Sequence, residues 1–168
     1  MAGEVEFDPV DSVAVGTVGK PGQRTFYLQA SSADRHLILH VEKVQVQALA
    51  ERAIELLQGR ELGPPEKPAA FEPPDQADWR AGELGLGYDE DRGRVAIAAQ
   101  ELAAGEETDP VTLRRALMWL RPAQMLALAV RALELVRAGR PACPMCGLPM
   151  DPNGHTCPRS NGKSPIFV

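Results

Sequence analysis

All three cysteines of the 168-residue chain lie in one short segment, CPMCGLPMDPNGHTC (143–157), which also holds a histidine. Two residues separate Cys143 from Cys146, and one residue separates His155 from Cys157. Two thiolates at the first spacing can bind the same metal ion, and the turn-forming sequence MDPNG brings the chain back to present the second pair. The pattern C-x2-C-x8-H-x-C therefore predicts four ligands for one ion.

Three sulfurs and one imidazole form a ligand set typical of zinc in structural sites. Catalytic zinc keeps a coordination position open for water, and four protein ligands leave none. An iron–sulfur cluster normally requires four cysteines and is a minor alternative, and a disulfide would leave one thiol unpaired. We therefore predict one structural Zn²⁺ per chain. A tail of about thirty residues cannot bury enough core to fold alone, and zinc would supply that free energy.

Three polar residues follow the last ligand and are candidates for partner binding. Arg159, Asn161 and Lys163 carry donors suited to phosphate or carboxylate groups. Residues 131–168 carry five basic and two acidic side chains, whereas residues 1–130 carry 13 basic and 21 acidic ones. The basic tail is thus expected to contact an acidic protein surface. The alternative is that these three side chains are simply solvated.

The composition is that of an ordinary globular protein, with 44% hydrophobic and 24% charged residues. No apolar run approaches the roughly 18 residues that would predict a membrane span. The acidic start, MAGEVEFDPV, lacks the apolar core of a secretory signal. We therefore expect a cytoplasmic protein, in which reduced cysteines bind metal rather than form disulfides.

Two segments of similar design precede the tail, which we place at 140–168. The first (1–62) shows two strands around the turn KPGQ, an alternating strand HLILHVEK and an apolar helical stripe at about 44–58. The second (79–139) shows a hairpin, the strand TLRRALMWL and a second stripe at about 122–138. Residues 63–78 contain a proline-rich sequence without periodicity, which predicts a linker.

The two predicted helices share a sequence register. ALAERAIELL (48–57) and ALAVRALELV (127–136) agree at seven of ten positions, and the same offset of 79 residues aligns the preceding strands. Helices draw on few residue types, so chance similarity is the alternative, but the extended register favours internal duplication. The predicted fold class is α+β: two antiparallel-sheet-plus-helix units related by a pseudo-twofold axis, with a zinc-ribbon-like tail.

The sheet face turned away from each helix carries a second group of candidate contact residues. Ile38 and His40 lie on it in the first unit, and Leu117 and Trp119 in the second. This face is too apolar to be fully hydrated. Either the units pack through it, within the chain or in a dimer, or it binds a partner through His40 and Trp119.

These features favour a zinc-containing cytosolic binding or adaptor protein that docks a protein partner. A nucleic-acid-binding regulator is one alternative, with Trp119 and Tyr27 as stacking groups, but the acidic body argues against it. An enzyme is another alternative. Its candidate acid–base residues are His36, His40, Glu42 and Lys43. No nucleophile–base pair at a telling spacing and no nucleotide-binding glycine motif supports catalysis.

Three stretches of the sequence carry a resemblance to a known family. GTVGKPGQRTFYLQA, EKVQVQALAER and GRPACPMCGLPMDPNGHTCPRSNG resemble a bacterial family catalogued as domain of unknown function 3090. The resemblance spans nearly the whole chain and implies a small cytosolic protein with a terminal zinc-ribbon-like motif. It also implies the ligand positions Cys143, Cys146, His155 and Cys157, and it implies no activity.

Overall fold

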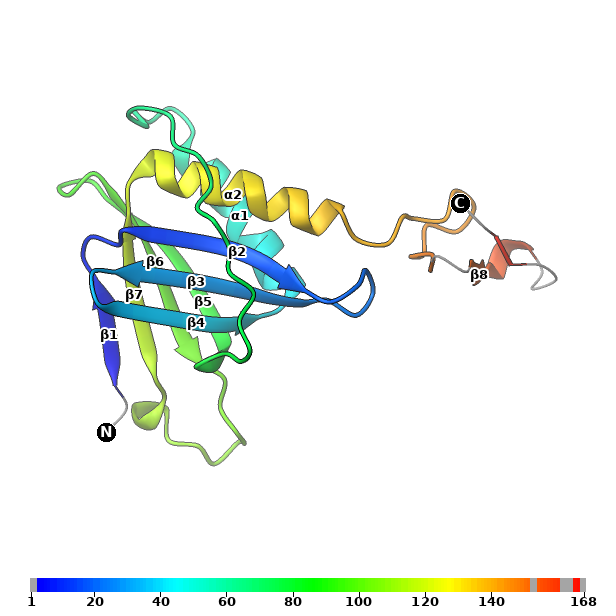
Figure 1. The fold of residues 1–168 in the computed structure, drawn as a ribbon, viewed down its shortest axis with the longest axis horizontal. Helices are drawn as coiled ribbons and strands as arrows, with labels where there is room; N and C mark the ends of the chain where they lie inside the picture. The colour runs from blue at the N-terminus through cyan, green and yellow to red at the C-terminus, as the bar shows by residue number, and fades with distance from the viewer. Residues whose placement is uncertain (1–2, 152–153, 161–164, 167–168) are drawn as a thin grey trace.

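The computed structural model describes residues 3–151, 154–160 and 165–166 (Figure 1). Its strands are β1 (Glu4–Phe7), β2 (Ser12–Val18), β3 (Thr25–Ser32), β4 (Arg35–Val41), β5 (Trp79–Asp89), β6 (Arg94–Glu101), β7 (Arg115–Leu120), β8 (His155–Thr156) and β9 (Pro165–Ile166). The α-helices are α1 (Lys43–Leu57) and α2 (Pro122–Arg137), and two 3-10 turns lie at Pro110–Thr112 and Pro158–Ser160. The predicted α+β class and both predicted helices are confirmed.

Seven strands form one mixed sheet in the order β1-β7-β6-β5-β4-β3-β2. The sets β2–β4 and β5–β7 are each antiparallel, as predicted for the two units. The sets are joined by the parallel pair β4–β5, and β1 adds to β7 as a second parallel pair. The sequence pattern did not predict this single mixed sheet, because alternation identifies a strand's faces and not its neighbours.

The sheet curls enough for a short connection to join its two edge strands. β1 and β2 are at opposite ends of the strand order, yet four residues connect them, and an extended chain spans at most about 3.5 Å per residue. The Val10 amide donates to the Trp119 carbonyl on β7, and the next amide, Asp11, donates to the Ser31 carbonyl on β3. Between Val10 and Asp11 the chain therefore passes from hydrogen bonding with β7 to hydrogen bonding with β3.

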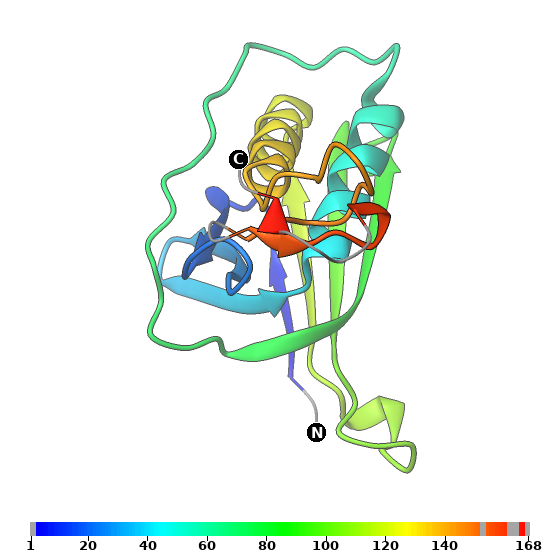
Figure 2. The ribbon, with the colours of Figure 1, turned by 90° about the vertical axis from the view of Figure 1, so that its right-hand side faces the viewer.

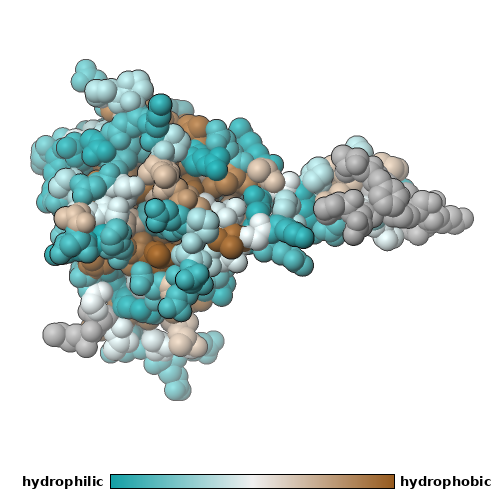
Figure 3. All heavy atoms as spheres, viewed as in Figure 1, coloured by the Kyte–Doolittle hydropathy of each residue, from teal (hydrophilic) through white to brown (hydrophobic). Residues whose placement is uncertain are grey.

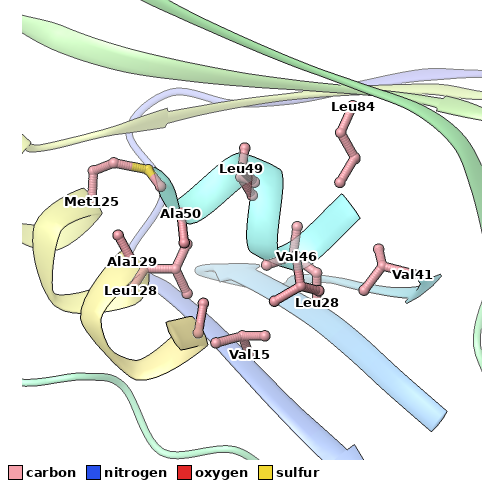
Figure 4. A pocket seen from close by; sticks show the side chains of 11 residues that line it. Val15, Leu28, Val41, Val46, Leu49, Ala50, Leu84, Met125, Leu128 and Ala129 are labelled. Atoms are coloured by element: carbon pink, nitrogen blue, oxygen red, sulfur yellow. The ribbon is translucent and has the colours of Figure 1, made fainter. Parts of the chain in front are cut away.

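Both helices pack side by side against the inner face of the curled sheet (Figure 2). Alternate residues of β3, β4 and β7 are buried on this face, and the buried residues of α1 recur at helical spacing. The space between helices and sheet is lined by apolar side chains such as Leu84 and Met125 (Figure 4). It leaves a void of about 10 Å³, which is too small for a ligand.

The segment predicted as a linker, residues 63–78, runs across the outer side of β2, β3 and β4 (Figure 1) and is called the strap below. Phe71 lies directly on Gly16 of β2, where an added Cβ atom would be 2.1 Å from the ring. The Gln29 side chain exchanges two hydrogen bonds with the backbone of Glu72. Near its start, Glu66 pairs with Arg121 at 2.6 Å. The strap is therefore fixed at both ends.

Candidate metal centre

The first half of the tail is a tight turn that presents two thiols. Ala142 and Pro149 form an isolated bridge, and the Cys143 amide donates to the Leu148 carbonyl at 2.8 Å. The Gly147 amide returns to the Cys143 carbonyl, and Gly147 has φ +75°, a conformation that favours glycine. The glycine after the second cysteine thus allows the chain to turn around the sulfurs.

The second half of the tail supplies the imidazole and the third thiol. The amide of Gly154 donates to the Asp151 carbonyl, which closes the turn that leads into β8. His155 begins β8, whose backbone pairs with β9, and Cys157 follows directly after the strand. Two short hairpin-like turns therefore face each other across the ligand atoms.

The four ligand atoms of Cys143, Cys146, His155 and Cys157 all lie within 4.8 Å of one another. The Sγ atoms of Cys143 and Cys157 are 3.9 Å apart, as are Sγ of Cys146 and Nε2 of His155. A tetrahedral ion with metal–sulfur bonds of about 2.3 Å requires sulfurs about 3.8 Å apart, so the group fits one ion. The three cysteines form no disulfide, which would need a sulfur–sulfur distance of about 2.05 Å.

The site has its own small core. Cys143, Met150 and Cys157 are buried together, and this cluster is separate from the main core of the body. Burial by itself would raise the pKa of Cys143, but hydrogen bonds outweigh it and lower that pKa to about 6. The donors are the backbone amides of Cys146 and Met145 and the side chains around the thiol. The same burial raises the pKa of Cys146, helped by the neighbouring thiols.

The structure brings together the four predicted ligands and places only one of the predicted tail contacts. Arg159 is exposed, and its Nη1 donates to the Met145 carbonyl at 3.1 Å, so it supports the first turn. Asn161 and Lys163 lie outside the described residues. Sequence reasoning missed two apolar side chains on the same turn, Met145 and Leu148, which are 46% and 50% exposed. Met145 lies between the first two cysteines and Leu148 lies shortly after the second, so the sequence could have placed both side chains on this turn.

The other candidate contacts, His40 and Trp119, lie on β4 and β7, which β5 and β6 separate. The Trp119 ring donates through Nε1 to Glu6 at 2.8 Å, and the guanidinium of Arg92 lies over it at 4.4 Å. His40 is half-buried, with Nε2 3.9 Å from a carboxylate oxygen of Glu42. The two residues therefore do not form one site, and each has partners within the chain.

The candidate acid–base residues are also dispersed. Glu42 pairs with Arg80, His36 is exposed, and the Lys43 ammonium group lies beside Gly139. The described residues contain one group of metal-ligating side chains, the Cys3His group in the tail. No helix in the described part of the chain is long and apolar enough to cross a membrane.

A curled mixed sheet packed against two helices, followed by a tail with a Cys3His group, defines a small α+β protein with a candidate metal site near its C-terminus. The segment that follows α2 extends away from the rounded body (Figure 3). Residues 5–157 match the family described as "Protein of unknown function (DUF3090)", and the chain belongs to this family. The matched range takes in all four ligands and ends on Cys157. No curated protein and no solved structure matches the chain.

Proposed function

We propose that the protein is a cytoplasmic binding module, in which a structural zinc ion keeps the tail folded as a docking platform for a protein partner. The observation that carries the proposal is the closed Cys3His set, with all ligand atoms within 4.8 Å of one another. Three thiolates favour zinc over hard cations, and four protein ligands fill a tetrahedral shell. Such a site supplies folding energy rather than an activated water.

The surface of the metal-held turn supports a protein as the partner. Met145 and Leu148 expose apolar side chains beside the basic group of Arg159. Methionine and arginine are enriched at protein contact surfaces, whose apolar centres are surrounded by a polar rim. The turn is fixed by metal and backbone hydrogen bonds, so little entropy is lost when a partner binds it.

Metal analysis tests the first half of the proposal. Native protein dialysed against a weak chelator is expected to retain about one zinc per chain. A protein that contains no zinc, or iron in its place, would refute the zinc assignment.

A capture experiment tests the docking surface. We expect a Met145→Ser, Leu148→Ser double variant to keep its zinc and lose the protein captured by the native chain. A Val111→Ser variant is the matched control, because Val111 is 76% exposed on the body, away from the tail. Equal capture by the double variant and the native chain would remove the turn from the interface.

We further propose that the two strand-and-helix units arose by duplication and are related by a pseudo-twofold axis. Gln45 and Gln124 are 79 residues apart, and the side-chain oxygen of each accepts a hydrogen bond from the backbone amide of the residue before its helix. The side chain of Gln45 also donates to the carbonyl of Gly82 on β5, in the second unit. The side chain of Gln124 likewise donates to the carbonyl of Asp11, just before β2 in the first unit. Residues 35–57 are therefore expected to superpose on 114–136 in a crystal structure. Dissimilar packing of the two helices would show that the sequence register is coincidental.

A further inference from the structure

A small basic pocket lies where the body joins the tail. It is lined by the hairpin between β2 and β3, the first residue of α1 and the segment that follows α2, with a volume of about 190 Å³. Three cations from these three places face it: Arg24, Lys43 and Arg140. None of the three belongs to the metal site, and the protein as a whole is acidic, with a net charge of −5. A local concentration of positive charge therefore needs an explanation.

Two glycines allow the cationic side chains to approach one another. A Cβ atom at Gly139 would lie 2.9 Å from Nζ of Lys43 and 3.3 Å from an Nη atom of Arg24. The Lys43 ammonium group and the Arg24 guanidinium group are therefore both close to Gly139. A Cβ atom at Gly22 would lie 3.1 Å from Nε of Arg140. Side chains at 22 and 139 would force the three cations apart.

The positive charge in the pocket is only partly balanced by acidic side chains. Among the described residues, Lys43 makes no ion pair or side-chain hydrogen bond, and Arg24 has one ring contact, with Phe26 at 5.4 Å. Arg140 pairs with Asp151 at 2.9 Å, which offsets one charge of the three. Like charges this close repel one another, and an anion in the pocket would remove that repulsion.

The carboxyl end of α2 offers a structural explanation that must be separated from binding. Its last carbonyls carry partial negative charge, and the Val136 oxygen lies beside the same point near Gly139. Neither Lys43 nor Arg24 hydrogen-bonds these carbonyls within the described structure. If the cations served the helix alone, removing one would destabilise the protein whether or not an anion is present.

We propose that this pocket binds a phosphoryl group, as inorganic phosphate or as a phosphate monoester. Three cations around a volume of this size suit one compact dianion, and two guanidinium groups can hold its oxygens in bidentate fashion. A nucleic-acid backbone would need a basic track along the surface, and the acidic body does not provide one. The site shares no residue with the docking surface of Met145, Leu148 and Arg159, so either proposal can fail alone.

Calorimetric titration of the native, metal-loaded protein with inorganic phosphate tests the site, with ionic strength held constant by chloride. We expect binding at one site per chain, weakened roughly tenfold or more by Lys43→Met, because a charge-assisted contact is lost. Lys67→Met changes the net charge equally on the exposed strap and is expected to change affinity less than about twofold. Parallel titration with phosphoserine distinguishes an ester from the free ion: comparable affinity indicates that an ester is accepted.

Thermal unfolding separates binding from support of α2. Without phosphate, Lys43→Met is expected to be at least as stable as the native chain, because a repulsive pair is removed. With phosphate, only the native chain and Lys67→Met should be stabilised. Absence of phosphate binding by the native chain, or equal binding by all three proteins, would overturn the proposal. Destabilisation by Lys43→Met without any phosphate effect would assign the cations to the helix end.

Discussion

The four candidate metal ligands could be predicted from the sequence because their grouping depends on local spacing. Cys143 and Cys146 are positioned by one turn, and His155 and Cys157 by the next, so no long-range information was needed. The support from Arg159 could not be foreseen in the same way. Its hydrogen bond to the Met145 carbonyl joins the two turns and depends on their packing.

Cys146→Ser is expected to abolish stoichiometric zinc binding and unfold the tail while leaving the body folded. The physical reason is that the tail's core of Cys143, Met150 and Cys157 is separate from the core that contains both helices. Zinc content and far-ultraviolet circular dichroism measure the two effects. Met145→Ser, on the same turn without a ligand atom, is the control and should retain zinc. Loss of helical signal in Cys146→Ser would show that the tail and body fold as one unit.

The ion pair between Glu66 and Arg121 predicts a pH-dependent contribution to stability. The hydrogen bond from Arg121 lowers the pKa of Glu66 below its ordinary value of 4.5, against the opposing effect of burial. A lowered folded-state pKa stabilises the protein above 4.5, and this contribution is lost as pH falls through the folded value. Because the pair is only partly buried and is screened by solvent, Glu66→Gln should cost about 0.5 kcal/mol at neutral pH.

Urea unfolding at neutral pH and at about pH 3 measures this difference between Glu66→Gln and the native chain. The difference should shrink as the pH falls through the folded-state pKa of Glu66, because the native carboxyl then becomes neutral like the amide of the variant. A difference of the same size at both pH values would show that the lost interaction does not depend on the charge of Glu66.

At the scale of secondary structure, the helices were predictable and the connections between strands were not. The apolar stripes of α1 and α2 appear in the sequence because each helix buries one face. The connection between the two edge strands is held by backbone hydrogen bonds of Val10 and Asp11, which any residue type could make and which the sequence therefore does not indicate. The strap was predicted as a linker because its prolines have no period. Phe71 anchors the strap by packing on Gly16, and this contact between distant parts of the chain is not visible in the sequence.

The contact between Phe71 and Gly16 predicts a measurable coupling. Phe71→Ala should destabilise the protein by about 1–2 kcal/mol, since a half-buried ring is lost. Gly16→Ala should also destabilise it, because the new Cβ atom would lie 2.1 Å from the ring and displace the strap. In the double variant the methyl group fits the space that the ring has left. The second substitution should therefore cost much less there than in the native background.

Chemical denaturation of the four proteins gives the coupling energy, which should be about 1 kcal/mol or more. Pro74→Ala is a suitable control for the strap, since Pro74 is in the same segment but does not lie against Gly16. Additive effects of the two substitutions would indicate that Phe71 does not rest on Gly16 in solution.

At the scale of the whole molecule, the basic pocket couples the body to the tail. Arg24 and Lys43 belong to the body, whereas Arg140 follows α2 and pairs with Asp151 of the tail. The pocket also touches Pro149, which bridges to Ala142 on the first metal-binding turn. Folding of the tail around zinc should therefore complete the pocket. The two sites share no residue, but Arg140 and Pro149 lie in the segment that carries the first two ligands, so binding at one site is expected to change the affinity of the other by a reciprocal factor.

Removal of zinc is accordingly expected to weaken phosphate binding several-fold, because Arg140 and Pro149 are no longer held in place. By the same linkage, phosphate should raise the affinity for zinc by an equal factor, measured by competition with a chelator. Phosphate also binds free zinc, so the comparison is made against Lys43→Met, in which that background effect is identical and the pocket is impaired. If phosphate changes zinc affinity equally in both proteins, the tail and the pocket are energetically independent. A shift confined to the native chain would establish that an anion at the base of the tail stabilises the metal-held platform.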